Sequence, residues 1–217
     1  DNALWQVTLN ANGLPGTPVQ VSGPKSPVEL AAEGNLLLMR ASDGSKGLEP
    51  WANILAGNTQ TTLQLQDLNV GSRGSQPSQF VFFNKRVYFS ARSSLDAGSG
   101  DRGLELHVYD PALKTAPVIS QVADLAPASA SSDPRQFVIS GPADSYSAGG
   151  RLFFTIATDN GIGLCMVRQN QAGVDSIDLV AGPDGVADLS FGSLLRNIES
   201  PTAVSCVVGG ALKSRVV

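Results

Sequence analysis

A segment that recurs along the chain constrains the fold more than any other feature of the sequence. It is clearest in residues 85–111, where an apolar run, Val87 to Phe89, is followed by a loop rich in Gly, Ser and Asp and then by an alternating run, Leu104 to Val108. Alternating runs on either side of a glycine-rich break are typical of a β-hairpin. No window shows a sustained 3.6-residue apolar repeat, so the sequence predicts an all-β chain.

Four short anchors recur in the same order along the chain. Each unit begins with a proline followed three residues later by an apolar residue, continues with an apolar triplet and a Gly-Leu pair, and ends at an Asp-Leu pair. The prolines are Pro27, Pro77, Pro134 and Pro201, and the Gly-Leu pairs begin Gly47-Leu48-Glu49, Gly103-Leu104-Glu105 and Gly163-Leu164-Cys165. Self-similarity on this scale indicates a repeat architecture.

Each unit is predicted to hold four short antiparallel strands, here called a to d, which is the sequence signature of a propeller blade. Strand a follows the proline, b is the apolar triplet, c follows Gly-Leu and d precedes Asp-Leu. One such sheet cannot bury both of its faces, so copies must stack. We therefore predict a single β-propeller domain over residues 1–217. Its parts are a half blade 1–26, blades 27–76, 77–133 and 134–200, and a half blade 201–217.

The order of the strands makes a specific prediction about closure. The chain begins with strands c and d and ends with strands a and b. If the two halves pair, they complete a fourth blade, and the closed ring has no exposed sheet edge. The alternative is that the 217 residues are a piece of a larger propeller.

The charge of the chain argues against nucleic acid as a partner, and its hydropathy argues against a transmembrane segment. The net charge is −4 and the 15 Lys and Arg residues are scattered, which argues against nucleic acid. No apolar run approaches the roughly 20 residues that span a bilayer, so no transmembrane segment is predicted. The first residue is Asp1, Lys is scarce, and Ser, Thr, Asn and Gly are abundant. This composition favours an exported protein, either processed or a fragment of a longer chain.

The segments GLEPW at 47–51 and GLELHVYD at 103–110, with the preceding ASDGSKG and VYFSA, resemble the ELWxxDGT-type repeat of large exported bacterial propeller-like proteins. The best copy is Asp43-Gly44 followed by Gly47, Glu49 and Trp51. The chain departs from the pattern where the terminal DGT is missing, and at Cys165, where the Glu is lost. The resemblance implies a propeller-like architecture and a cell-surface or secreted setting, without an assigned activity.

The loop between strands b and c of the second unit is the candidate metal site. Asp96, Asp101 and Glu105 stand among glycines there, and several carboxylate oxygens suit Ca²⁺. The D-x-D-x-D-G spacing is missing, so a plain turn built on Asp-Gly chemistry is the stronger interpretation, as at Asp43 and Asp159. No other cofactor is predicted.

No catalytic site is predicted, and the chain is interpreted as a non-enzyme. His107 is the one histidine, and its strand c position favours a packing residue over a general base. Cys165 and Cys206 lie within predicted strands, where they are either two buried thiols or a single disulfide.

Two features predict contacts with a partner. The insertion at 140–149 exceeds what a hairpin needs, and Tyr146 within it is the predicted partner contact. Trp5 and Trp51 occupy the same repeat position, which favours packing between blades. If exposed, they would stack on a sugar ring or on a partner side chain.

These observations predict a non-catalytic, exported β-propeller that binds or docks onto another protein in a cell-envelope or extracellular assembly. One alternative is a carbohydrate-binding or carbohydrate-processing propeller that uses the acidic loop and Trp. A further alternative is a structural segment of a large surface adhesin.

Overall fold

The part of the chain that the computed structural model describes consists of β-strands and their connections. The described residues are 2–57, 59–94, 101–113, 118–126, 130–141, 150–158, 161–169, 173–181, 204–208 and 211–215. Within these ranges there is no helix, so the all-β prediction is confirmed for them. It follows that no helix there is long and apolar enough to cross a membrane.

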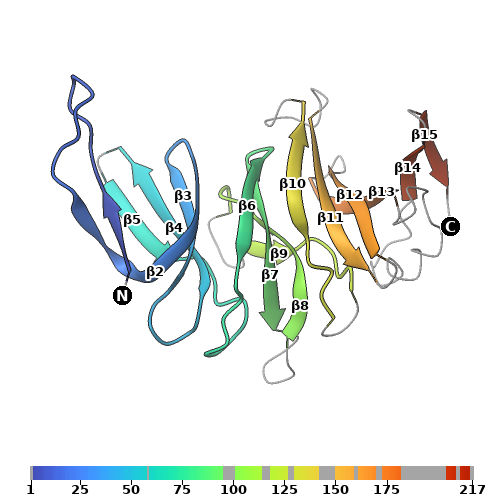
Figure 1. Ribbon diagram of the computed structural model, residues 1–217, viewed down its shortest axis with the longest axis horizontal. Coiled ribbons are helices and arrows are strands. Elements are labelled where there is room, and N and C mark those ends of the chain that lie inside the picture. The colour runs from blue at the N-terminus through green and yellow to red at the C-terminus, as the bar shows by residue number, and fades with distance from the viewer. Residues whose placement is uncertain are drawn as a thin grey trace.

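The first sheet has five antiparallel strands that follow one another in chain order. They are β1 (Ala3–Gln6), β2 (Val19–Glu33), β3 (Leu36–Ser42), β4 (Glu49–Ala56) and β5 (Thr59–Gln64). The long β2 is strongly curved, so that β1 and the first part of β2 fold over the face of β3 and β4 (Figure 1). A Cβ atom on Gly23 of β2 would lie 3.7 Å from the Trp51 ring of β4. The sheet therefore has the form of a half-barrel.

Two further sheets each have four antiparallel strands in chain order. The second contains β6 (Ser78–Phe83), β7 (Arg86–Ser94), β8 (Asp101–Tyr109) and β9 (Ile119–Gln121), and the third contains β10 (Arg135–Ser140), β11 (Arg151–Thr158), β12 (Gly161–Gln169) and β13 (Asp175–Ala181). A separate two-stranded sheet contains β14 (Val204–Val208) and β15 (Ala211–Arg215). The predicted strands a to d thus correspond to β2–β5, β6–β9 and β10–β13.

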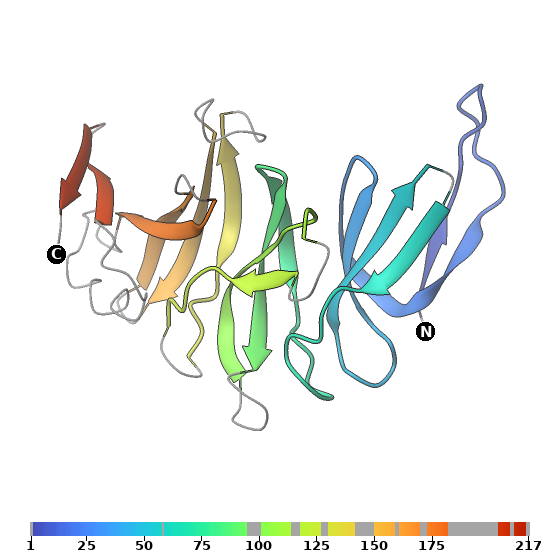
Figure 2. The same ribbon diagram turned by 180° about the vertical axis from the view of Figure 1, so that it is seen from behind.

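The three larger sheets stack along the long axis of the molecule (Figures 1 and 2). Apolar side chains pack between them. On β7, Val87 and Phe89 pack with residues of the first sheet such as Leu38. Tyr88, which lies between them in sequence, packs with residues of the third sheet such as Phe154. Successive side chains of a strand point to opposite faces. The continuous apolar triplet is therefore explained by burial of β7 on both faces.

The backbone around the repeated proline has the same conformation in each of the three units. The residue before the proline and the second residue after it have positive φ, between 49° and 58°, at Ser26 and Glu29, Gln76 and Gln79, and Asp133 and Gln136. The pairing of β2, β6 and β10 with the following strand is irregular at the same place. Positive φ is uncommon for residues other than glycine. The shared conformation is therefore evidence, independent of the sequence anchors, that the units are structural copies.

Strands a of neighbouring sheets lie next to one another. The backbone N–H of Gln79 donates to Oε2 of Glu29 at 3.3 Å, and the backbone N–H of Gln136 donates to Oε1 of Gln79 at 2.8 Å. The side chain at one repeat position therefore binds the backbone of the next copy. This side-by-side arrangement of β2, β6 and β10 is compatible with a propeller-like fold, in which strands a occupy the inner edge.

The pairing register corrects the predicted alignment of the third unit. The fourth residue of strand b pairs with Trp51 in the first sheet, with His107 in the second and with Cys165 in the third. Cys165 is therefore the counterpart of Trp51 and His107, whereas the counterpart of Glu49 and Glu105 is Gly163. The prediction was displaced by two residues because Gly161 and Gly163 both precede an apolar residue.

The predicted pairing of the two terminal half blades is not found among the described strands. β1 pairs with β2, and β15 pairs with β14. The two pairs lie at opposite ends of the molecule (Figures 1 and 2), so a closed four-bladed propeller is not confirmed. The N-terminal half blade instead continues into the first sheet, because its second strand and the following strand a form the single strand β2.

We predict that Gly103→Ala will strongly destabilise the fold, because Gly103 has φ +78° and an added Cβ would overlap the Ala130 carbonyl. Gly34→Ala is the matched control, because Gly34 also has positive φ (+57°) but has no atom within 4 Å of the added Cβ. The control should cost about 1 kcal/mol from backbone strain alone, and Gly103→Ala about 3 kcal/mol or more. Urea unfolding of both variants checks this, and equal costs would contradict it.

Candidate functional site

The predicted metal ligands of the second unit are only partly described. Asp96 lies outside the described residues, and for Asp101 the structure describes the strand but not the side chain. Glu105 is fully buried in β8. Among the described residues there is no group of three or more His, Cys, Asp or Glu side chains that could hold a metal ion. The calcium site therefore stays a prediction, and so does the contact of Tyr146, which also lies outside the described residues.

Glu105 binds the segment that connects the second sheet to the third. Its Oε2 accepts hydrogen bonds from the backbone N–H of Leu125 at 2.9 Å and from Oγ of Ser132 at 2.7 Å. Its Oε1 accepts a hydrogen bond from the backbone N–H of Ser132 at 3.0 Å. Both oxygens of this carboxyl group are therefore occupied by donors of the connecting segment.

Glu49 of β4 makes the same contacts one repeat earlier. Its Oε2 accepts hydrogen bonds from the backbone N–H of Leu68 at 3.0 Å and from Oγ of Ser75 at 2.6 Å, and its Oε1 accepts one from the backbone N–H of Ser75 at 2.8 Å. Leu68 and Leu125 belong to the repeated Asp-Leu pair, and both serines lie two residues before the repeated proline. The glutamate of the repeat is thus a structural residue in these two units, and it fixes each connection to the sheet that precedes it.

The two buried carboxyl groups have similarly perturbed pKa values. Burial raises the pKa of Glu49 and of Glu105 to about 7, although the hydrogen bonds from the serines and backbone N–H groups act in the opposite direction. Burial disfavours the charged form of an acid when desolvation exceeds the gain from hydrogen bonding. Both groups therefore titrate in the neutral range.

A second interaction repeats beside each glutamate. Lys46 forms an ion pair with Asp67 at 3.9 Å, and Arg102 forms one with Asp124 at 3.6 Å. The cations lie three residues before Glu49 and Glu105, and the acids belong to the Asp-Leu pairs. The Asp of the repeated Asp-Leu pair is therefore explained in these two units by its ion pair.

The turn prediction holds at Asp43. Its Oδ1 accepts hydrogen bonds from the backbone N–H groups of Lys46 at 2.9 Å and Ser45 at 2.7 Å, and from Oγ of Ser45 at 2.8 Å. The backbone hydrogen bond from Lys46 is the largest cause that lowers the pKa of Asp43 to about 2. This is the local side-chain capping that makes Asp common in turns. Asp159, the other position at which this turn was predicted, lies outside the described residues.

His107 and Cys165, which share a repeat position, are both buried in their strands. His107 stacks on Phe89 with a ring centroid separation of 5.9 Å, and its Nδ1 lies 3.1 Å from the carbonyl oxygen of Glu105. Burial lowers the pKa of His107 to about 4 and raises the pKa of the free Cys165 thiol to about 12. Imidazole and thiol are therefore both uncharged at neutral pH. The side chain of Cys206 is not described.

A charged cluster that the sequence analysis did not anticipate joins the second and third sheets. Arg86 of β7 forms ion pairs with Asp110 and with Asp175 of β13, each at 3.1 Å. The hydroxyl of Tyr88 also donates to Asp175, at 3.0 Å. Asp175 has a raised pKa because of its burial. Arg86 and Asp175 are 89 positions apart in the sequence, and Tyr88 and Asp175 are 87 positions apart. No local pattern could therefore have indicated these contacts.

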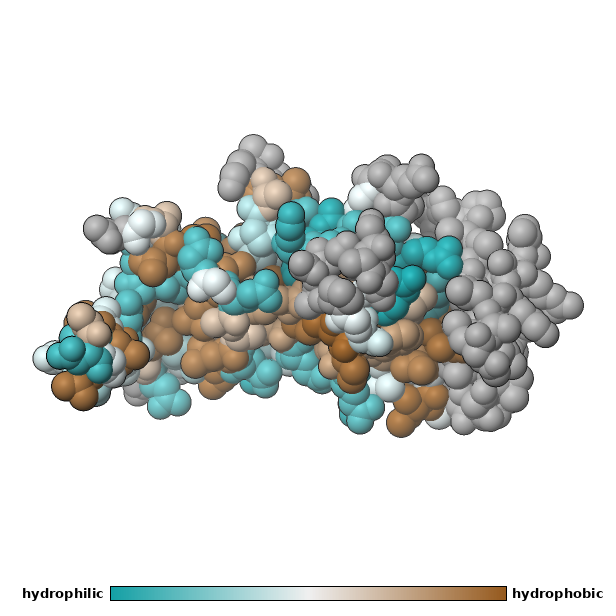
Figure 3. All heavy atoms as spheres, turned by 90° about the horizontal axis from the view of Figure 1, so that it is seen from above, coloured by the Kyte–Doolittle hydropathy of each residue, from teal (hydrophilic) through white to brown (hydrophobic). Residues whose placement is uncertain are grey.

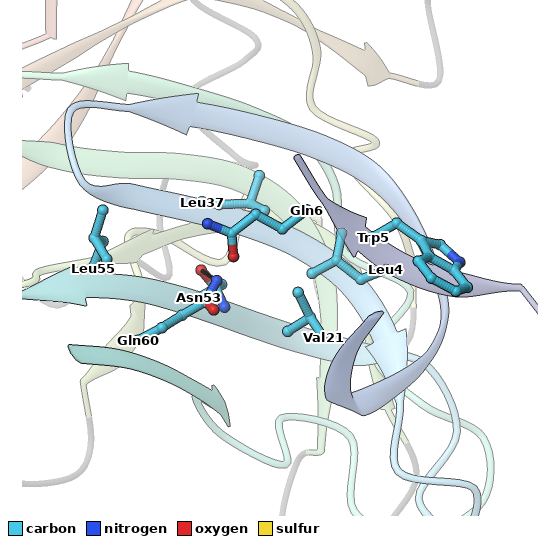
Figure 4. A pocket seen from close by; sticks show the side chains of 8 residues that line it. All are labelled: Leu4, Trp5, Gln6, Val21, Leu37, Asn53, Leu55 and Gln60. Atoms are coloured by element: carbon cyan, nitrogen blue, oxygen red, sulfur yellow. Dashed lines mark hydrogen bonds between the residues drawn. The ribbon is translucent and has the colours of Figure 1, made fainter. Parts of the chain in front are cut away.

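The candidate site for a binding partner is a groove at the N-terminal end of the molecule. We call it the N-terminal groove, and its volume is about 210 Å³. The residues that line it are Leu4, Trp5, Gln6, Val21, Leu37, Asn53, Leu55 and Gln60. Figure 4 shows Leu4 and Val21 turned toward β3 and β4, with the ring of Trp5 at the rim beside β1. Amide groups line part of the groove, and Gln60 Nε2 donates to Oδ1 of Asn53 at 3.0 Å.

Two of the apolar residues that line this groove, Trp5 and Leu55, have exposed side chains. Trp5 is 58% exposed and Leu55 43% exposed, whereas Trp51, at the same repeat position as Trp5, is 7% exposed. Other large apolar side chains exposed on the first sheet and its N-terminal loop are Val7, Leu9, Leu14, Val19, Leu30 and Leu63. Hydrophobic side chains are also visible at this end of the molecule in Figure 3. Packing is thus confirmed for Trp51, while Trp5 is available to a partner.

Comparison of the chain with protein-family models, with curated proteins and with solved structures finds no match.

We predict that the buried glutamates make stability fall as pH rises. Between pH 4.5, the ordinary pKa of Glu, and pH 7 the folded state binds protons more tightly than the unfolded state, so the free energy of unfolding decreases through this window. Each group contributes up to roughly 3 kcal/mol to this decrease, at about 1.4 kcal/mol per pKa unit. Urea unfolding of the wild type and of Glu49→Gln/Glu105→Gln, at pH 5 and pH 7.5, measures the effect.

Comparing the two proteins isolates the glutamates from His107, whose lowered pKa acts in the opposite direction. The double variant should lose less stability than the wild type between pH 5 and pH 7.5. If both lose the same amount, the assignment of this pH dependence to the two glutamates is wrong.

Proposed function

We propose that this chain is a non-catalytic β-propeller scaffold that docks onto another protein through its N-terminal groove. The proposal includes an exported location, in a cell-envelope or extracellular assembly, which rests on composition and on the resemblance to the ELWxxDGT-type repeat. It also includes the assignment of the three larger sheets as blades. The observation that carries the docking function is the exposed apolar surface around Trp5 and Leu55.

We choose the N-terminal groove as the docking site because the faces between the three larger sheets are already covered. The facing surfaces of the first and second sheets, and of the second and third, are covered by one another. The N-terminal face has similar apolar chemistry, but among the described residues it is covered by β1 and the first part of β2 alone. Exposed apolar surface bordered by polar groups is typical of a protein interaction site. Gln6, Asn53 and Gln60 supply polar groups here.

The test is photo-crosslinking in cells that express the protein, with a photoreactive phenylalanine derivative in place of Trp5. The matched control places the same group at Ile162, which is 64% exposed and lies on β12 of the third sheet. We expect a protein adduct from position 5, identified by mass spectrometry, and none from position 162. No adduct at position 5, or the same adducts at both positions, would contradict the proposal.

A glycan is the second candidate ligand, because the exposed indole of Trp5 lies beside the amides of Gln6 and Asn53. Aromatic rings stack on sugars, and amides donate to hydroxyl groups. Glycan-array binding and hydrolysis assays separate this candidate from protein docking. Binding lost in Trp5→Ala would favour the glycan at the groove, and activity lost in Asp96→Ala or Asp101→Ala would favour carbohydrate processing at the acidic loop.

A further inference from the structure

A second cavity lies between the second and third sheets, which are neighbours in the stack (Figures 1 and 2). We call it the inter-sheet cavity, and its volume is about 280 Å³. Its lining includes the charged cluster of Arg86, Asp110 and Asp175, together with side chains of β9 and of the loops that precede β9 and β13. The cavity therefore joins a polar cluster to a space in which a small molecule fits.

The repeat shows that charged residues are not required at this place. By the pairing register, Arg86 corresponds to Leu36 of the first sheet, and Asp110 corresponds to Ile54. Leu36 and Ile54 pack against the core between the first and second sheets. Burying an ion pair gains little stability over apolar residues of similar volume. The stacking of the sheets therefore does not explain why the second sheet carries an ion pair here.

The charges that line the cavity do not balance. The lining carries the two carboxyl groups of Asp110 and Asp175 and the single guanidinium of Arg86. Nε of Arg86 is 3.1 Å from Asp110, and Nη1 is 3.1 Å from Asp175 and 2.9 Å from the carbonyl oxygen of Gly173. The guanidinium is thus compensated by both acids, and one negative charge is left in excess.

Asp110 is the carboxyl group that a ligand can reach. Its side chain is 20% exposed, whereas that of Asp175 is 4% exposed. Among the described residues, Asp110 accepts hydrogen bonds from Arg86 and from the backbone N–H of Ala112. A carboxylate has sites for about four hydrogen bonds, so Asp110 can accept further donors.

Apolar side chains form another part of the lining. Leu113, in the turn after β8, is 50% exposed, and Val174, directly before β13, is 60% exposed. Both are large apolar residues that the described fold leaves open to solvent. A ligand that covered them would gain from the burial of apolar surface.

We propose that the inter-sheet cavity binds a small organic cation, whose primary ammonium group donates to Asp110 and whose short apolar chain covers Leu113 and Val174. An ammonium group carries three donors, and its hydrogen bonds to a carboxylate are charge-assisted. The excess negative charge attracts a cation and repels an anion. This site is separate from the N-terminal groove, so the proposal goes beyond the docking function and does not depend on it.

The test is an NMR titration of the isotope-labelled protein with butylammonium. Butyrate and butanol are the matched probes, because they keep the apolar chain and replace the cation by an anion or by a neutral hydroxyl group. We expect butylammonium to shift the signals of the Gly173 amide and the Arg86 Nε–H, with a Kd of about 1 mM, as suits so small a ligand. The other two probes should bind about tenfold more weakly or not at all, because they lack the charge-assisted contact.

Two variants place the binding in the cavity. Asp110→Asn keeps the shape of the side chain and removes the excess charge, so it should weaken butylammonium binding about tenfold. Ser120→Leu, on the β9 side of the lining, fills part of the cavity without changing its charge and should also weaken binding. Glu33→Gln, at an exposed position of β2, changes the total charge as Asp110→Asn does and should leave binding unchanged. The NMR spectrum of each variant shows whether it is folded.

Several results would overturn the proposal. One is the absence of any shift at Gly173 and Arg86 with butylammonium, and another is butyrate that binds as tightly as butylammonium. Equal weakening by Glu33→Gln and Asp110→Asn would show general attraction to an acidic protein. Wild-type affinity in both Asp110→Asn and Ser120→Leu would show that the cation binds elsewhere. None of these results bears on docking at the N-terminal groove, which the crosslinking experiment tests.

Discussion

The structure depends on a buried carboxyl group in strand c that holds the connection between one sheet and the next. Glu49 and Glu105 each accept three hydrogen bonds from that connection, two of them from backbone N–H groups. A connection buried between sheets would otherwise leave backbone donors unsatisfied, at a cost of about 1–3 kcal/mol each. The glutamate removes this cost and fixes the distance at which the next sheet begins.

The three larger sheets can stack because the second sheet is apolar on both faces and packs against a neighbour on each side. Val87 and Tyr88 are neighbours on β7, yet they belong to two different hydrophobic cores, one on each side of the second sheet. At the N-terminal end, β1 and β2 cover the apolar face of the first sheet incompletely, and part of its apolar surface stays exposed. The exposure of Trp5, in contrast to the burial of Trp51, is the consequence of this incomplete cover. The exposed apolar surface at this end is therefore a property of the architecture and not of one added motif.

Much of the fold was predictable from local patterns, while the candidate site was not. The strands follow from period-two alternation, which needs only neighbouring residues. Cys165 was aligned with the glutamate position because two pairs of Gly and an apolar residue, Gly161-Ile162 and Gly163-Leu164, are adjacent. The correct pair could have been chosen from the sequence, since Asp159 precedes Gly161 by two residues, as Asp101 precedes Gly103. The role of Glu105 was missed because a carboxylate in a polar loop sequence indicates exposure, and burial depends on a segment some 20 residues away.

By itself, the sequence determined the strand class, the number of strands in each unit and the residues that repeat, because strands and turns are encoded by residues close together in the chain. The tertiary structure decided that Glu49 and Glu105 are buried and that Arg86 binds Asp175. It also decided that β1 and β15 lie apart (Figure 1). These outcomes depend on how successive sheets are rotated and stacked. That geometry is set by contacts between distant segments, which no local periodicity records.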